Sequence, residues 1–587
     1  MIFRNYQLEW NVLQPDITRF QHVSLSHKVT HINCFSIIQK RLYSGLNLLL
    51  KTRAQVPIMI IKSPESDAYL TFFESILSSM NEANKKKETK LYGGRYEIAE
   101  GIIHWYPAQN IQDNFASDGN VYHAGWIENQ DLLGCVRFYQ SKISLSPGLV
   151  HRANGGVLIL PIRTLLAQPL IWLRLKKIIT CKQFEWCSND EKKPLPLDIP
   201  PMPIYLRLLL VGECDILEEF QNLEPELSSI SIYGEFEDKI QIVNDLTLMN
   251  WKVWVQNIAN SFQCTNLDTT FWPVLMHEGV RWTGDQASLP LDLEWIRNQI
   301  QGAILHSQEE IISGETLQKA LNERAWREGF LSEQILNHIE QEQIHIDTLG
   351  SVIGQINALS VLRFPGHPSA FGEPVRISCV VHFGDGELSD VERKVALGGN
   401  IHSKSLIIIQ SWLMSVLQLN QPMPFSASLV FEQSYTEVDG DSASLAALCA
   451  LISALSLKPI NQKIAVTGSL DQFGHVQSVG GINEKIEGFF RICNKRTLSG
   501  NQGVIIPSSN IQNLALHKDV IHAVKNNQFY IWAVSNVEEA LFLLTEIAWK
   551  NKDTPSLFNF ITNRILKLTT QDSQKRIGPL HWLRFLK

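Results

Sequence analysis

Short, bounded runs of apolar residues, separated by stretches of helical periodicity, constrain the fold of this chain more than any other feature. Three runs lie in its N-terminal part: VPIMII at 56–61, VLIL at 157–160 and YLRLLLV at 205–211. Runs of this length are typical of strands buried on both faces, which occur in parallel sheets covered by helices. We therefore predict a parallel α/β region, assigned to residues 1–270.

The middle of the chain changes to helical periodicity. Residues 293–310, 314–329 and 332–341 each carry apolar residues three and four positions apart. That spacing places the apolar side chains on one face of a helix. We expect a small lid-like helical bundle at 271–345.

Strands and helices alternate again in the C-terminal part. Strands are expected at 376–383, 426–431, 463–467 and 503–507, and helices at 404–419, 443–457, 483–493 and 537–548. This alternation predicts a second α/β domain at 346–550, so the fold class is multidomain α/β. The basic tail at 551–587 is a candidate docking helix without an indicated partner.

Composition excludes several classes of protein. A chain of 587 residues is too long for a single core. Its net charge of −7 gives no reason to expect a nucleic-acid partner. The lysine-rich stretch at 81–90 is expected to be a surface loop and not a binding site.

The sequence also predicts a cytoplasmic protein without a membrane partner. It contains no run of about 18 apolar residues, and its first twenty residues lack the apolar core of a signal peptide. The nine cysteines form no C-x-x-C pair and none stands at zinc-site spacing from a histidine. An odd number of scattered cysteines favours a reducing compartment, and no metal site is expected.

Residues 437–457, EVDGDSASLAALCALISALSL, contain the first candidate for chemistry. Gly440 lies between Asp439 and Asp441 and can supply an unusual backbone angle that exposes Ser442 at the start of a helix. Unpaired amides at such a start can hold an oxyanion. By itself, however, Ser442 also fits an ordinary helix N-cap.

Residues 464–490, IAVTGSLDQFGHVQSVGGINEKIEGFF, contain the second candidate. Lys485 belongs to the apolar stripe of Ile482 and Phe489 on a short helix. Burial and the positive end of the helix both favour the neutral amine, which can act as a base toward a serine. Alone, Lys485 also fits a lysine that extends to solvent or pairs with a neighbouring glutamate.

Together the two segments resemble the Lon peptidase family. The resemblance extends through EVDGDSAS, VTGS, VGGINEKIEGFF and GVIIPSSN, and the separations between these motifs agree with the family's spacing. It implies that Ser442 is the nucleophile and Lys485 the general base. It further implies that the Thr467 hydroxyl holds the lysine amine and that Asp439, before Gly440, shapes the site. His475 is interpreted as a turn residue, because the family has no catalytic histidine.

The N-terminal part resembles the AAA+ ATPase region of the Lon-related, LonB-like subgroup. The segments HRANGGVLIL, YLRLLLVGE and IDTLGSVIGQINALSV carry this resemblance. A P-loop needs glycines near the phosphates, a lysine for their charge, and Ser or Thr for magnesium. Here the corresponding positions hold Lys62, Glu65 and Asp67, then Ala68 and Tyr69.

The second nucleotide motif is altered as well, since Pro161 stands where an acidic metal ligand is expected at the end of VLIL. We therefore expect a degenerate AAA+ fold and a serine endopeptidase that needs no cofactor for peptide hydrolysis. ATP binding is still implied by the resemblance, as are protein or peptide substrates and a hexameric ring of identical chains. Two alternatives stay open: a non-catalytic adaptor or assembly subunit, and an ATP-dependent protease.

Overall fold

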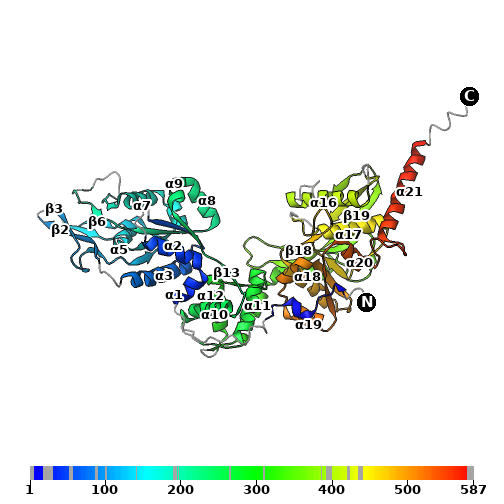
Figure 1. The fold of residues 1–587 in the computed structure, drawn as a ribbon, viewed down its shortest axis with the longest axis horizontal. Helices are drawn as coiled ribbons and strands as arrows, with labels where there is room; N and C mark the ends of the chain where they lie inside the picture. Colours follow the sequence, from blue (N-terminus) through cyan, green and yellow to red (C-terminus); the bar gives the residue numbers. More distant parts are fainter. Residues whose placement is uncertain are drawn as a thin grey trace, which may run out of the picture. The chain divides into compact units, whose positions relative to one another are not determined.

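A computed structural model describes most of the chain. The described residues are 5–16, 31–51, 57–85, 90–99, 102–139, 142–188, 195, 197–262, 266–307, 311–384, 386–391, 399–418, 423–433 and 440–577. They separate into two compact units (Figure 1). The five-stranded unit comprises Val23–Asn266 and Pro290–Gln301; the seven-stranded unit comprises Met1–His22, Leu267–Leu289 and Gly302–Lys587.

The chain therefore enters each unit more than once. The helices expected at 271–345 fall partly in each unit: most of α12 (Leu293–Leu305) is in the five-stranded unit, while α11 (Phe271–Thr283), α13 (Gly314–Glu328) and α14 (Phe330–Glu340) are in the seven-stranded one. The domain boundaries drawn from the sequence stay predictions.

A fully parallel sheet forms the centre of the five-stranded unit. Its strand order is β12 (Ile232–Glu235), β1 (Ile58–Lys62), β11 (Arg207–Gly212), β8 (Val157–Pro161) and β5 (Val121–His123). The three apolar runs of the sequence became β1, β8 and β11, and almost every residue in them is buried. The predicted parallel α/β sheet is thus confirmed.

One prediction in this unit is wrong. Helix α3 (Asp67–Lys85) continues through the first half of the stretch expected to be a loop at 81–90. Met80, one residue before that stretch, is buried, so packing favours continuing the helix although the following residues are polar. After α3 the chain forms a small antiparallel sheet, in which β2 (Tyr92–Ala99) lies between β3 (Ile102–Pro107) and β4 (Phe115–Ser117).

The seven-stranded unit contains a mixed sheet. Its order is β20 (Leu388–Asp390), β21 (Phe425–Phe431), β19 (Phe371–Phe383), β18 (Gln355–Leu362), β23 (Ile464–Val466), β26 (Gln502–Pro507) and β27 (Phe529–Val534). Strands β18, β19 and β21 pair antiparallel, whereas β18, β23, β26 and β27 pair parallel.

Helices cover both faces of this sheet. On one face are α16 (Asn400–Val416), α17 (Ser444–Ser456), α20 (Val537–Thr545) and α21 (Leu557–Ile577); on the other are α18 (Ile482–Lys495) and α19 (Lys518–Lys525). Successive residues of β26 alternate between the faces. Ile505 packs into the core under α17, whereas Val504 and Ile506 pack into the core under α18 and α19. The expected strands and helices of this part are confirmed, with ends shifted by a few residues.

Two segments near the chain ends belong to this unit. The amide of Leu8 donates to the carbonyl of Ile531 and the amide of Ala533 donates to that of Tyr6, which aligns residues 6–8 with β27. The buried Leu13 joins the core that contains α18 and α19. In Figure 1 the N-terminal segment lies beside α19. The candidate docking helix of the tail is α21, whose Leu557 and Ile561 pack into the core against α17.

No helix among the described residues is long and apolar enough to cross a membrane.

Candidate active site

Two helices from opposite faces of the seven-stranded sheet begin close to the end of β23. Thr467 follows the last residue of this strand, and the amide of Gly468 donates to the carbonyl of Ser442, 2.9 Å away, just before α17. Helix α18 begins at Ile482 and carries Lys485 in its first turn. Side chains at the carboxyl ends of parallel strands can converge on one point, which is where α/β sheets commonly bind ligands.

Ser442 lies two residues before α17 and is half-buried. The amide of Ser444 donates to the carbonyl of Asp441, so the chain turns immediately around Ser442. Gly440 does not adopt the unusual backbone angle that we expected: its φ is outside the left-handed region, and a Cβ there would meet no atom within 4 Å. Asp439 lies outside the described residues.

Lys485 is buried, with 3% of the residue exposed, as its position in the apolar stripe predicted. Burial lowers the pKa of its amine from 10.5 to about 8, while the negative charges of Asp441 and Glu484 act in the opposite direction. A lowered pKa means that the neutral amine is populated near neutral pH. The lysine therefore does not extend to solvent.

Thr467 connects the lysine to the serine segment. The Lys485 Nζ donates to Thr467 Oγ1 at 3.3 Å, and Thr467 Oγ1 donates to the carbonyl of Ser442, also at 3.3 Å. Thr467 is fully buried, and its amide donates to Ile505. The structure records no direct hydrogen bond between the side chains of Ser442 and Lys485, both of which it describes. Such contacts are often loose without substrate.

Two residues next to the predicted ones were missed in the sequence. Ser469 Oγ donates to Asp441 Oδ2 at 2.7 Å, which holds this carboxylate beside the candidate serine. Asp441 is also the stronger of the two negative charges that raise the pKa of Lys485, whereas the acidic residue singled out in the sequence was Asp439. The adjacency of Asp441 and Ser442 in the motif was the available signal. His475 lies in the exposed turn between β24 (Ser469–Leu470) and β25 (Val476–Gln477), as interpreted.

Two glycines allow α18 to approach the sheet. A Cβ on Gly372 of β19 would lie 1.9 Å from the carbonyl oxygen of Glu484 and 2.8 Å from Lys485 Cα. A Cβ on Gly488 would lie 2.3 Å from the carbonyl oxygen of Gly372. The backbones of strand and helix therefore touch at the turn that carries the lysine.

In the five-stranded unit, the positions compared in the sequence with a P-loop carry side chains that are paired with other residues of the unit. Glu65 accepts two hydrogen bonds of 2.9 Å from Arg163, one from its backbone amide and one from its guanidinium. Arg163 lies two residues after Pro161, which ends β8. The carboxylate that follows β1 is thus paired with a cation of the same unit.

Tyr69, at the position expected for Ser or Thr, is fully buried. Its hydroxyl donates to Asp292 at 2.9 Å and accepts from the amide of Leu293 at 3.2 Å. The ring packs edge-on against Phe236, with ring centroids 5.1 Å apart. The Tyr69 side chain is thus held by two hydrogen bonds and by ring packing within the unit.

Comparison with known proteins agrees with both halves of this description. The family description "Lon protease (S16) C-terminal proteolytic domain" matches residues 431–546, and "LonB-like, AAA domain" matches residues 120–234. A Lon protease homolog of Escherichia coli (strain K12) is 48% identical over 98% of this chain and 98% of its own length.

This chain belongs to the Lon protease family. Another Lon protease homolog, from Haemophilus influenzae, is 41% identical over 95% of this chain and 93% of its own length. An archaeal Lon protease of Pyrococcus abyssi is 25% identical over 81% of this chain but only 46% of its own length. This Lon family member thus combines an AAA-like α/β region with helices and the C-terminal proteolytic domain.

Proposed function

We propose that this Lon family member is a serine endopeptidase with Ser442 as nucleophile and Lys485 as general base. The observation that carries the proposal is the environment of Lys485: a buried amine with a pKa of about 8, bonded to the same threonine hydroxyl that reaches the Ser442 backbone. Among the described residues, no carboxylate is hydrogen-bonded to this buried amine, so the amine is suited to accepting a proton.

In the proposed reaction, neutral Lys485 takes the proton of the Ser442 hydroxyl as its oxygen attacks a peptide carbonyl. Because the amides of Ser444 and Leu445 already donate to Asp441 and Gly468, we assign the developing oxyanion to the amides of Ser442 and Ala443. The lysine then gives its proton to the leaving amine. Lys485 next removes a proton from the water that attacks the acyl-enzyme and gives this proton to the Ser442 oxygen as the acyl bond breaks, which restores both side chains.

Thr467 has a supporting role in this proposal. Its hydroxyl accepts one hydrogen of the lysine amine and so directs the amine toward the serine segment. Asp441, held by Ser469, supplies a negative charge that stabilises the lysinium formed during the reaction. Asp439 and Gly440 stay assigned to the site through the family motif alone.

We further propose that the AAA-like region does not hydrolyse ATP. The Glu65 carboxylate would repel phosphate and is already paired with Arg163. The position expected for the phosphate-binding lysine holds Ala68, and the position expected for the magnesium-binding hydroxyl holds Tyr69, whose phenol is bonded to Asp292. Residual nucleotide binding is not needed for the proposed peptide hydrolysis. Unfolded or small proteins are the proposed substrates, and a ring of identical chains is the proposed assembly.

Hydrolysis of casein and of a fluorogenic peptide by the full-length protein tests this function. Ser442→Ala and Lys485→Ala are each expected to remove nearly all turnover, because members of such a pair act as a unit. The rate should be the same with and without ATP–Mg²⁺. Thr467→Val should lower the rate more than Thr467→Ser, which keeps the hydroxyl.

Three outcomes would contradict the proposal. Activity that survives Ser442→Ala would remove the serine from its role, and a rate that depends on ATP would show a working nucleotide site. No cleavage by well-folded protein under either condition would favour an adaptor or assembly subunit.

A further inference from the structure

Helix α18, which carries Lys485, is tied near its N-terminal end to a helix far away in sequence. Arg281 of α11 forms a bidentate ion pair with Glu487, with distances of 2.6 and 3.1 Å between the guanidinium nitrogens and the carboxylate oxygens. The side chains of Arg281 and Glu487 are 24% and 12% exposed. Both helices belong to the seven-stranded unit. A bidentate pair shielded from water fixes orientation more firmly than a single surface contact.

The loop before α19 joins the same contact. Arg281 also donates to the carbonyl of Ala515 at 2.7 Å, and Glu487 accepts from the amide of His517 at 2.8 Å. Asn483, two residues before Lys485, donates to the carbonyl of Asn513 and accepts from the amide of Ala515. The first turns of α18 are therefore fixed by contacts at Asn483, before Lys485 in the sequence, and at Glu487, after it.

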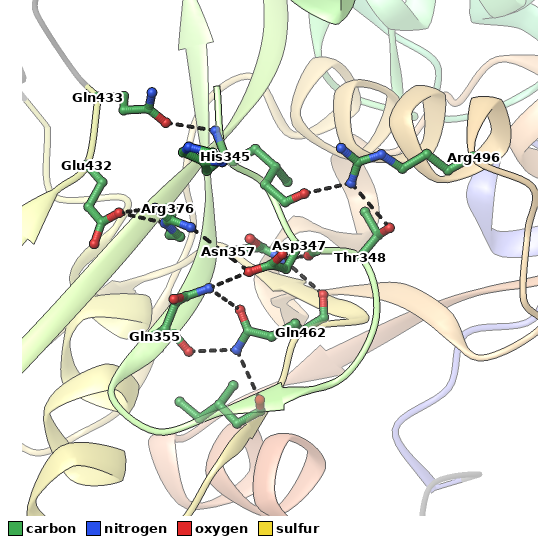
Figure 2. Close-up of polar contacts among 12 residues, drawn as sticks. His345, Asp347, Thr348, Gln355, Asn357, Arg376, Glu432, Gln433, Gln462 and Arg496 are labelled. Atoms are coloured by element: carbon green, nitrogen blue, oxygen red, sulfur yellow. Dashed lines mark hydrogen bonds and ion pairs between the residues drawn. The ribbon is translucent and has the colours of Figure 1, made fainter. Parts of the chain in front are cut away.

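The other end of α18 is fixed to the segment that leads into the sheet. Arg496 donates to the carbonyl of Ile346 at 2.6 Å and to that of Ile339 at 3.1 Å, and Figure 2 shows it reaching Thr348 as well. Ile492 packs with Ile339 and Ile346 in a small core of its own. The helix thus has anchors at both ends, and the N-terminal anchor is the one near the lysine.

We propose that Arg281 and Glu487 are positioning residues for Lys485: their ion pair fixes the first turns of α18 so that the amine stays buried against Thr467. The proposal rests on the proposed function, in which Lys485 is the base. Residues i and i+2 of a helix point to different sides, so Glu487 acts through the helix backbone and not by touching the amine. Arg281 lies outside the residues that match the proteolytic domain.

A loosened α18 would change the pKa of Lys485, because this pKa depends on how deeply the amine is buried. Burial holds the pKa of the amine at about 8, and Asp441 and Glu484 are the charged groups that oppose this shift. If α18 moves outward, water reaches the amine and its pKa rises toward 10.5. Each unit of rise leaves about tenfold less neutral lysine at pH 7.

Full-length Arg281→Gln, Arg281→Lys and Glu487→Leu test the proposal. Lys485 is titrated by competitive acetylation of the amines at a series of pH values, read by mass spectrometry, and peptide hydrolysis is measured over the same range. In Arg281→Gln and Glu487→Leu we expect a rise of about one pH unit in the Lys485 midpoint and in the midpoint of kcat, with about a tenfold loss of kcat at pH 7. KM should change less than twofold. Arg281→Lys should be intermediate, because lysine cannot form the bidentate contact.

The ion pair of Arg324 with Glu278, at 2.8 Å, provides a matched control. It joins α13 to α11 in the same unit, and neither residue belongs to α18, so Arg324→Gln should leave both midpoints unchanged. A general loss of stability would lower the amount of active protein without moving a midpoint.

Unchanged midpoints in folded Arg281→Gln would overturn the proposal. If Arg281→Gln does not fold, unchanged midpoints in Arg281→Lys would overturn the proposal instead. The labelling result does not depend on cleavage. If the wild-type protein cleaves no peptide, but the Lys485 midpoint still rises in the variants, the proposed function is contradicted and the positioning role is supported.

Discussion

At the scale of single residues, the protonation of Lys485 is the property from which the proposed chemistry follows. Burial makes the neutral amine accessible, whereas Asp441 and Glu484 limit the shift in its pKa. The same lysine in water would be almost entirely charged at pH 7 and could not accept a proton. The opposing charges leave the amine basic enough to be protonated during the reaction.

The pH dependence of peptide hydrolysis should report this balance. Because only the neutral amine acts as base, kcat/KM should rise with pH and level off above about 8. Glu484 raises the pKa of Lys485, so Glu484→Gln should move the midpoint to lower pH. The exposed Glu538 of α20 provides the control, since Glu538→Gln removes a charge that does not act on Lys485. An upward shift in Glu484→Gln would contradict this explanation.

The same burial should cost stability. Below pH 8 Lys485 is charged in both the folded and the unfolded chain, so folding includes the full cost of burying the charge. Between pH 8 and 10.5 the folded chain releases its proton first, and the cost declines as pH rises. Lys485→Met should therefore raise the free energy of unfolding by about 3 kcal/mol at pH 7 and by much less at pH 10.

Denaturant unfolding at both pH values measures this difference. Lys495 is on the same helix with 42% of its side chain exposed, so Lys495→Met should show no comparable change with pH. If Lys485→Met changes the free energy of unfolding equally at pH 7 and pH 10, folding does not include the cost of burying a charged amine.

At the scale of elements, the contact between β19 and α18 determines where the lysine lies. The missing side chains of Gly372 and Gly488 allow the two backbones to touch. A larger residue would push away the turn that contains Lys485. Motif similarity does not reveal this requirement, because Gly372 is far from both motifs in the sequence.

We expect Gly372→Ala to lower the free energy of unfolding by about 1–3 kcal/mol, the usual cost of overpacking, and to reduce peptide hydrolysis strongly. Its Cβ would clash with the backbone of Glu484 and Lys485, which cannot rotate away. Gly480→Ala is the matched control, since no atom lies within 4 Å of a Cβ there and its φ is not positive. Thermal unfolding and peptide hydrolysis are measured for both variants. Equal stability and equal activity of the two variants would exclude the steric explanation.

At the scale of the whole molecule, each unit is assembled from separate stretches of chain. The core around α18 contains Leu13 from the N-terminal segment, and the amide of Leu516 donates to the Leu13 carbonyl. Helix α11 joins the same unit from the middle of the sequence. The residues 346–550 that the sequence assigned to the peptidase domain therefore do not include all of the packing around Lys485.

Leu13→Ala should lower the stability of the seven-stranded unit by about 2–5 kcal/mol, because it removes a fully buried side chain. Asn11→Ala, at an exposed position two residues earlier, should have little effect. The thermal midpoint of peptide hydrolysis measures both. If the two variants behave alike, the N-terminal segment does not contribute to this core.

The sequence by itself determined those features that are recorded in short, contiguous stretches. Apolar runs predicted β1, β8 and β11, and an apolar stripe predicted α18, because each pattern states which faces of an element are buried. Ser442 at a helix start and Lys485 in an apolar stripe were candidates from their own segments. Their roles, and the choice of Thr467, came from the resemblance of these segments to the Lon family.

Only the tertiary structure decided which distant residues meet. The pairs of Asp441 with Ser469, Glu65 with Arg163 and Arg281 with Glu487 join segments whose local sequences carry no sign of their partner. Periodicity records that a side chain is buried but not what it is buried against, and hydrogen bonds and ion pairs depend on that second fact. The surroundings that set the pKa of Lys485 are therefore a property of the folded chain.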